Sequence, residues 1–375
     1  MTDPLTEDLM SRAARVAETA HRYAEEADRT GALDPETVKA LTAAGYPRHF
    51  VPVRWGGTDG TFTELAEAMA LIGKTCASTA WCSSMFAYSA RFATHLSLRA
   101  QKEFWGESPN VLWVSGLVPS GATEPVDDGF RLDGRWSYVS GATFSDWAIL
   151  AGPRQGPGAQ PPRFFAVPRA DYTVEETWDN VGMRATGSHT VVLRDVFVPE
   201  HRTVLLAEVV AGINKVSHSP QHNVPLMAVG GLTCVAPVIG AVGGMVDAYA
   251  ALVAARRSAP GGGVTPVNDL VLARAAADLD SAALLAGRAA ALLDAGEARR
   301  FAVRNARDAA YLGRLLADTA HELIRTAGTS VQGAAHPLQR LWRDITAATS
   351  HAALRFDRAA TAYADTLLAS ERAGE

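Results

Sequence analysis

The chain has 375 residues, a formal net charge of −5 at pH 7 and a pI near 6.1. Its hydrophobic share of 48% and charged share of 20% allow two or three packed domains and exclude a disordered chain. No basic surface or block of like charges indicates a nucleic-acid partner.

The N-terminus and the cysteines indicate a cytoplasmic protein. The first residues are acidic and polar, without the basic and then apolar order of a signal peptide. The longest apolar stretch, Val224 to Ala248, contains glycine, proline and Asp247, which argues against a membrane span. The three cysteines, Cys76, Cys82 and Cys234, have no C-x-x-C spacing, so we expect reduced, buried thiols that serve packing.

The first third of the chain predicts helices. From Leu5 to about Tyr23, apolar residues recur at helical spacing. A second helix is expected from Pro35 to Ala44, because Asp34 can cap its first amides and Gly45 can end it in a left-handed conformation. The apolar stretch from Phe62 to Ser97 predicts one or two further, buried helices.

The middle of the chain predicts short strands separated by Gly, Pro and Asp. These runs are Val111 to Gly116, Gly129 to Gly141, Trp147 to Ala151, Arg163 to Val167 and Thr190 to Val198. In the second run the even-numbered residues from Phe130 to Ser140 alternate with polar ones, as in a half-buried antiparallel strand. The Gly- and Pro-rich stretch 154–162 is interpreted as a surface hairpin loop.

Helical spacing returns beyond Gly212, most clearly at Leu312, Leu316 and Leu323, and predicts a C-terminal bundle. No repeat of fixed period occurs, which disfavours a solenoid. We therefore expect an α+β protein with N-terminal helices at 1–112, a central antiparallel β-domain at 113–212 and a helical bundle at 213–375.

Several local strings carry a family resemblance. They are FVPVRWGG at 50–57, CASTAW at 76–81, GRWSYVSGATFSDW at 134–147, GMRATGSHT at 182–190, DVFVP at 195–199, QRLWRD at 339–344 and TSH at 349–351. With the order of helices, strands and bundle, they resemble the acyl-CoA dehydrogenase superfamily. Within it they are most similar to two-component flavin-dependent hydroxylases such as the aromatic polyketide hydroxylase of the actinorhodin pathway. More distantly they are similar to 4-hydroxyphenylacetate, dibenzothiophene and amino-sugar monooxygenases.

The resemblance implies a homotetrameric oxygenase that accepts reduced FMN, or FAD, from a separate NAD(P)H-dependent flavin reductase. Such enzymes form a flavin hydroperoxide with O2 and transfer its terminal oxygen, here to an aromatic or quinone polyketide. The chain has no G-x-G-x-x-G string after a strand, so a nicotinamide-binding unit of its own is not expected. N-oxygenation of an amine or amino sugar, an acyl-CoA dehydrogenase with FAD and a non-catalytic scaffold remain alternatives.

Two residues are the candidates for catalysis. Ser140 lies where the resemblance places a hydroxyl beside flavin N5, although it also suits the end of a strand. His351 lies where related hydroxylases place a catalytic His, and near the position of the dehydrogenase Glu. Its unperturbed pKa suits removal of a phenol proton. A histidine satisfied within a helix interface is the alternative for His351. Tyr138 matches an aromatic at the flavin face, or faces the core.

Other residues are candidates for holding the flavin. Arg256 and Arg257, before the glycines at 261–263, correspond to the flavin-phosphate grip that relatives form across a subunit boundary, or end a helix favourably. Arg184, Thr186 and Ser188 in the GMRATGS turn are expected to contact flavin or to shape its oxygen-reactive face, although a tight turn also explains this string.

The substrate side is predicted from aromatic and histidine residues. Trp81, Phe86 and Tyr88 are candidates for stacking on a planar ring, or belong to the core. The second His that related hydroxylases have in this helix is absent here. His218 and His222 are interpreted as a substrate-side loop rather than a metal site, because no carboxylate or cysteine accompanies them. No metal is expected.

Overall fold

The computed structural model describes residues 8–153, 161–259 and 265–373, so most of the predicted hairpin loop at 154–162 lies outside the described residues. The N-terminal helices are α1 (Leu9–Thr30), α2 (Pro35–Ala43), α3 (Phe62–Gly73), α4 (Ala77–Ala93) and α5 (Leu98–Trp105). The predicted cap is confirmed, since the Asp34 side chain accepts from the backbone N–H of Glu36 and Pro35 begins α2. The stretch predicted as one or two helices is two, α3 and α4.

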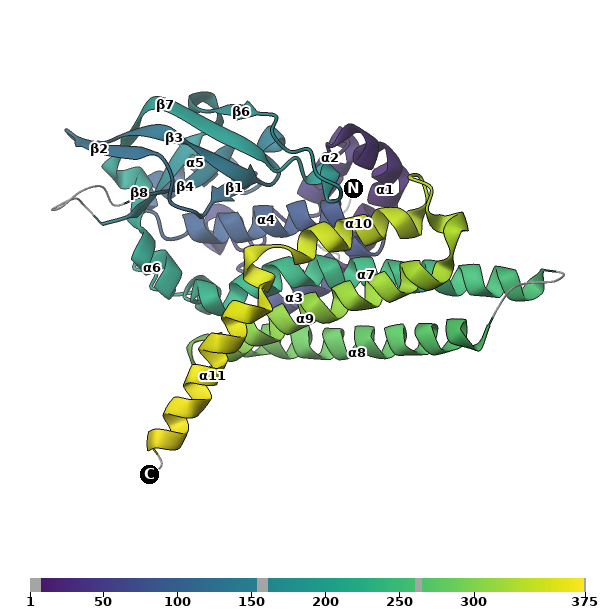
Figure 1. The fold of residues 1–375 in the computed structure, drawn as a ribbon. Helices are drawn as coiled ribbons and strands as arrows, with labels where there is room; N and C mark the ends of the chain where they lie inside the picture. Colours follow the sequence, from purple (N-terminus) through teal and green to yellow (C-terminus); the bar gives the residue numbers. More distant parts are fainter. Residues whose placement is uncertain (1–7, 154–160, 260–264, 374–375) are drawn as a thin grey trace.

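The β-domain is formed by two four-stranded sheets (Figure 1). One sheet has the order β1-β4-β5-β8 and the other β2-β3-β7-β6. All neighbouring strands are antiparallel except β1 and β4, which are parallel. The strands are β1 (Trp113–Gly116), β2 (Ala122–Val126), β3 (Gly129–Val139), β4 (Trp147–Gly152), β5 (Arg163–Pro168), β6 (Thr173–Glu175), β7 (His189–Pro199) and β8 (Thr203–Leu205).

Strand β3 departs from its predicted alternation near its end. The alternation holds from Phe130 to Trp136 and is wrong beyond it. The register with β7 shifts between Trp136 and Val139, which is the geometry of a β-bulge. Tyr138 has a φ of +64° and is 78% exposed, whereas Val139 is fully buried. The bulge therefore turns Tyr138 out of the core and re-aims the residues that follow it.

The C-terminal part is helical and packs below the sheets (Figure 1). Its helices are α6 (Leu206–Ala211), α7 (Leu226–Ser258), α8 (Pro266–Asp294), α9 (Ala298–Ala327), α10 (Pro337–Thr349) and α11 (Phe356–Ala373). Short 3-10 turns occur along the whole described chain: η1 (Val53–Trp55), η2 (Ala142–Phe144), η3 (Arg169–Asp171), η4 (Arg184–Thr186), η5 (Glu200–Arg202), η6 (Pro220–His222), η7 (Thr329–Val331) and η8 (Ala352–Leu354). The predicted α+β architecture is confirmed.

Helix α7 is the central element of the bundle and packs against α3, α4, α8, α9 and α10. Among the described residues it is the one helix long and apolar enough to cross a membrane, yet 83% of its most apolar 18-residue window is buried inside the molecule. Its glycines allow close packing: a Cβ on Gly240 would lie 2.1 Å from the carbonyl oxygen of Ala70 in α3. These features are those of a core helix.

Candidate active site

A chain of hydroxyl groups forms where the bulged end of β3 meets η4 and the start of β7. Ser140 Oγ lies 2.8 Å from Ser188 Oγ, which lies 2.7 Å from Thr186 Oγ1. Thr186 Oγ1 lies 2.8 Å from the carbonyl oxygen of Met183. The indole N–H of Trp81 in α4 donates to Ser140 Oγ at 3.1 Å. Three of the predicted flavin-side residues are thus brought together, and Trp81 joins them.

The acceptor at the end of this chain sets the direction of every hydrogen bond in it. A carbonyl oxygen only accepts, so Thr186 donates its single hydroxyl hydrogen to Met183. Ser188 must then donate to Thr186, and Ser140 must donate to Ser188. Ser140, which also accepts from Trp81, keeps one lone pair for a further donor. The partly buried hydroxyl of Ser140 is therefore an acceptor toward any ligand beside it.

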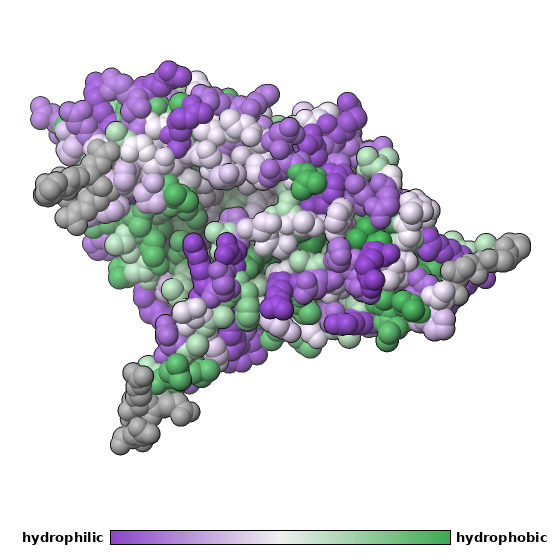
Figure 2. Space-filling model, in the orientation of Figure 1, coloured by the Kyte–Doolittle hydropathy of each residue, from purple (hydrophilic) through white to green (hydrophobic). Residues whose placement is uncertain are grey.

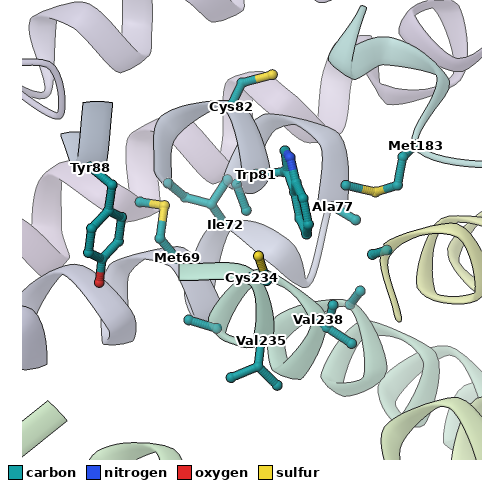
Figure 3. Packing of buried hydrophobic residues seen from close by; sticks show 14 of the residues in the cluster. Met69, Ile72, Ala77, Trp81, Cys82, Tyr88, Met183, Cys234, Val235 and Val238 are labelled. Carbon is teal, nitrogen blue, oxygen red and sulfur yellow. The ribbon is translucent and has the colours of Figure 1, made fainter. Parts of the chain in front are cut away.

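Trp81 also contacts the second catalytic candidate. Its ring lies edge to face with the His351 imidazole, with centroids 5.6 Å apart and planes at 71°. Helix α4 holds Trp81 firmly, because 16 of its 17 residues are buried. Figure 3 shows Trp81 above Cys234 and beside Met183. Ser140 and His351, which are far apart in sequence, therefore both contact one indole.

His351 is positioned by the end of α10 and by α7. It is the N-cap of η8, where its Nδ1 accepts from the backbone N–H of Ala353 at 3.2 Å. Cys234 Sγ in α7 lies 3.4 Å from the same nitrogen. Burial of the ring lowers the pKa of His351, although the residue as a whole is exposed. The three cysteines are free and buried as expected, but Cys234 has this polar contact in addition to packing.

The QRLWRD string holds the GMRATGS turn in place. Asp344 accepts from the backbone N–H of Met183 at 2.6 Å, and Met183 has a left-handed φ of +54°. Burial raises the pKa of Asp344 to about 6. Arg343 pairs with the Asp28 carboxylate at 2.5 Å and donates to the carbonyl of Val181 at 2.7 Å. These contacts fix the strained backbone that supplies the acceptor for Thr186.

The arginines predicted to contact flavin form hydrogen bonds and ion pairs with other residues of this chain. Arg184 donates to the backbone oxygens of Asp28 and Asn180, both at 2.9 Å, and to Asp179. Arg256 donates to the carbonyl of Ala327 at 2.5 Å and to Ser330 at 3.0 Å. Arg257 is paired with Asp269, and both side chains are 55% exposed.

Helix α7 separates the arginine pair from the Trp81 centre. Arg256 lies 22 residues beyond Cys234 on α7, which is about 33 Å along the helix. One chain therefore does not bring the arginine pair and the Ser140 hydroxyl to the same place.

The predicted substrate aromatics have different surroundings. Trp81 lies at the centre described above, and Phe86 packs against Gly141, where a Cβ would lie 2.7 Å from its ring. Tyr88 belongs to an aromatic cluster with Phe50 and Phe62, at 5.2 and 6.2 Å between centroids. In Figure 3 Tyr88 lies on the far side of Met69 from Trp81.

The two loop histidines also differ. His222 is fully buried, with Nδ1 2.6 Å from Ser217 Oγ and Nε2 2.7 Å from the carbonyl of Phe50. Both ring nitrogens of His222 are thus used inside the chain, whereas His218 is exposed. Within the described ranges no group of three or more His, Cys, Asp or Glu side chains is placed to hold a metal ion.

The residues around Ser140 fit a reduced flavin. In reduced flavin N5 carries a hydrogen, and the hydroxyl chain leaves Ser140 as an acceptor for such a donor. The exposed ring of Tyr138, two residues away, offers an apolar surface at the same strand end. The acceptor that Ser140 provides thus suits a flavin whose N5 is protonated.

Comparisons with known proteins identify the family. Two family models match: the acyl-CoA dehydrogenase N-terminal domain over residues 5–105 and the C-terminal domain over residues 232–356. The flavin-dependent monooxygenase oxygenase subunit HsaA of Rhodococcus jostii is 32% identical, over 94% of this chain and 96% of its own length. The FADH2-dependent resorcinol hydroxylase oxygenase component of a Rhizobium species is 30% identical, over 98% and 95%.

Solved structures of related enzymes have the same fold. The crystal structure of 3-HSA hydroxylase from Rhodococcus sp. RHA1 superposes with a TM-score of 0.90 at 29% identity, over 98% of both chains. XiaF from Streptomyces, in complex with FADH2 and glycerol, superposes with a TM-score of 0.85 at 27% identity, over 96% of both chains.

Fold and site together define a flavoenzyme with the acyl-CoA dehydrogenase architecture. The chain belongs to the flavin-dependent monooxygenases of that fold, as the oxygenase component of a two-component system. Such a component uses reduced flavin that a separate reductase supplies.

Proposed function

We propose that this oxygenase uses reduced FMN and O2 to hydroxylate a phenolic or quinone-type aromatic ring, of the kind found in aromatic polyketides. The observation that carries the proposal is the position of Trp81, which hydrogen-bonds Ser140 and packs on His351. The names of the similar proteins support an aromatic substrate, since they include a resorcinol hydroxylase and two pigment production hydroxylases.

Each residue of the site has a role that follows from its contacts. Bound reduced flavin supplies the electrons that activate O2 for transfer of one oxygen atom to the ring. Ser140 would accept a hydrogen bond from the N–H at N5 of a bound reduced flavin, while Trp81 keeps the Ser140 hydroxyl oriented and closes one side of the site to water. His351 hydrogen-bonds the oxygen substituent of the substrate ring.

The site does not favour an acyl-CoA dehydrogenase. That reaction needs a carboxylate base beside the flavin, and the 347–351 stretch contains none. Asp344, three residues before this stretch in α10, is buried and binds the backbone of Met183 instead. We therefore place this chain with the oxygenases.

The arginine pair leads us to propose a homotetramer in which Arg256 and Arg257 reach the flavin phosphate of a neighbouring subunit. The length of α7 between Cys234 and Arg256 supports this arrangement. Large apolar side chains exposed on α8 and α11 also support it: Val267, Leu270, Leu284 and Leu368. Figure 2 shows the corresponding apolar patches along these two helices. We further propose FMN as the physiological flavin and the cytoplasm as the location.

Stopped-flow absorbance tests the function. Protein mixed anaerobically with reduced FMN is mixed with oxygenated buffer, and a transient band should precede the spectrum of oxidised flavin. Phenols and hydroxyquinones added with O2 should then yield product with one additional oxygen atom, labelled when 18O2 is used. Flavin that oxidises as fast as in free solution, with no labelled product, would contradict the proposal.

A further inference from the structure

The imidazole of His351 has its two nitrogens in different surroundings. Nδ1 faces the protein, where Ala353 N–H and Cys234 Sγ lie at 3.2 and 3.4 Å. Nε2 has no hydrogen-bond partner in the part of the chain that the structure describes, and His351 is an exposed residue. One edge of the ring is thus occupied by the chain, and the other is open to a ligand.

The backbone contact fixes where the hydrogen of the neutral ring lies. A backbone N–H only donates, so Nδ1 must be the acceptor in the pair with Ala353. The alternative tautomer, with hydrogen on Nδ1, would set two N–H groups against each other. The geometry of the η8 N-cap therefore places the hydrogen on Nε2.

Cys234 supports the same tautomer. Burial raises the pKa of its thiol to about 12, so the sulfur keeps its hydrogen near neutral pH. An S–H group is a weak donor, and the sulfur of Cys234 lies 3.4 Å from Nδ1 of His351, which can accept its hydrogen. Two donors from two elements, α7 and η8, thus occupy the one nitrogen that a neutral imidazole could use as a base.

We propose that His351 acts as a neutral hydrogen-bond donor through Nε2, and that the oxygen atom it contacts on the substrate is a phenolate or a quinone-type carbonyl. A neutral imidazole with Nδ1 occupied cannot take the proton of a phenol at Nε2, which already carries a hydrogen. That phenol proton must therefore leave to solvent before or during binding. This inference rests on the proposed hydroxylase function and replaces the role of base expected for His351.

The proposal narrows the substrate class. A phenol with a pKa near that of tyrosine, about 10, is ionised in roughly one molecule in a thousand at pH 7. A site that only donates to the oxygen therefore selects phenols made acidic by a carbonyl group in conjugation, or hydroxyquinones. Across substituted phenols of similar size, affinity at fixed pH should rise as the phenol pKa falls toward 7, and it should level off below.

The decisive comparison is between His351→Gln and His351→Ala. A glutamine amide places a donor near the position of Nε2 but cannot act as a base, whereas alanine removes the donor. Turnover of an acidic phenol by His351→Gln should stay within about fivefold of wild type, and that by His351→Ala should fall about 10-fold to 100-fold. His336 caps α10 in the same way, through Leu338 N–H at 3.2 Å, so His336→Gln controls for loss of a histidine cap.

Nitrogen-15 NMR of histidine-labelled, flavin-free protein gives a readout that needs no turnover. The signals absent from His351→Gln belong to His351, and they should show an unprotonated Nδ1 and a protonated Nε2. Hydrogen on Nδ1, or His351→Gln as inactive as His351→Ala beside an active wild type, would overturn the inference. Failure of wild-type protein to hydroxylate every phenol and quinone tested would instead overturn the proposed function, since the NMR result stands apart from it.

Discussion

The indole N–H of Trp81 donates to the hydroxyl oxygen of Ser140 at 3.1 Å, across 59 positions of sequence. The bond joins helix α4 to the bulged end of strand β3, and the same indole packs on His351. Trp81 thereby fixes the orientation of Ser140 from one side, and the Ser188 hydroxyl fixes it from the other. The single lone pair left on Ser140 gives the site its preference for a ligand that donates.

Ser140→Ala should shorten the transient absorbance that precedes oxidised flavin in stopped-flow experiments. Loss of one hydrogen bond is worth about 1 kcal/mol, so the decay should accelerate roughly fivefold to tenfold and less of the consumed O2 should reach product. Ser140→Thr keeps the hydroxyl and serves as the control. An unchanged decay in Ser140→Ala would remove Ser140 from the role proposed here.

Thr186→Val should weaken the preference for reduced over oxidised flavin. Without the Thr186 hydroxyl, Ser188 loses its acceptor, and Ser140 is free to reverse its hydrogen bond and act as a donor. The ratio of the two dissociation constants, measured anaerobically for reduced FMN and in air for oxidised FMN, should fall by roughly fivefold. Thr186→Ser keeps the hydroxyl chain and should keep the ratio. If the ratio of dissociation constants were equal in Thr186→Val and Thr186→Ser, the hydroxyl chain would not set the direction of the Ser140 hydrogen bond.

Asp344→Asn should change the pH dependence of stability. The pKa of Asp344 in the folded protein is about 6, above the value near 3.9 of an unfolded chain. The wild type therefore loses stability as pH rises from about 4 to 6, by about 3 kcal/mol from this group. Asparagine keeps the acceptor for Met183 N–H without ionising. The difference in Tm, variant minus wild type, should grow across this window, and a flat difference would contradict the prediction.

Gly141→Ala should destabilise the fold and disturb the site. Gly141 has a φ of +75°, and a Cβ there would lie 2.7 Å from the Phe86 ring, so strain and overlap add to about 2 to 4 kcal/mol. Gly287 in α8 has no atom within 4 Å of the same position, so Gly287→Ala should stabilise by about 0.5 to 1 kcal/mol. Chemical denaturation of both variants gives the comparison. Similar changes in the free energy of unfolding for the two variants would show that the surroundings of Gly141 tolerate a Cβ.

Periodicity and caps predicted much of the fold, because they report local structure. The Asp34 cap and the polar alternation of β3 as far as Trp136 were visible in the sequence, whereas the break between α3 and α4 was left open. The bulge at Tyr138 was not, because it depends on the register with β7.

The candidate site was predictable only in part. Ser140 and His351 were identified through a family resemblance, whereas Cys234 gave no signal, since its partner lies 117 positions away. Nor did the sequence show that Arg184 binds Asp28, a contact that only the packing of α1 against η4 creates.

The contacts of Asp28 with Arg184 and Arg343 have a consequence for biosynthesis. The Asp28 carboxylate binds Arg343, 315 positions later in the chain. The Asp28 carbonyl oxygen accepts a hydrogen bond from Arg184, which lies between the two in sequence. In a nascent chain α1 leaves the ribosome long before α10, so these contacts can form only near the end of translation. The turn that carries Thr186 and Ser188 should therefore remain without its support from α10 until then. Newly made protein should acquire the ability to bind flavin late, after its sheets have already formed.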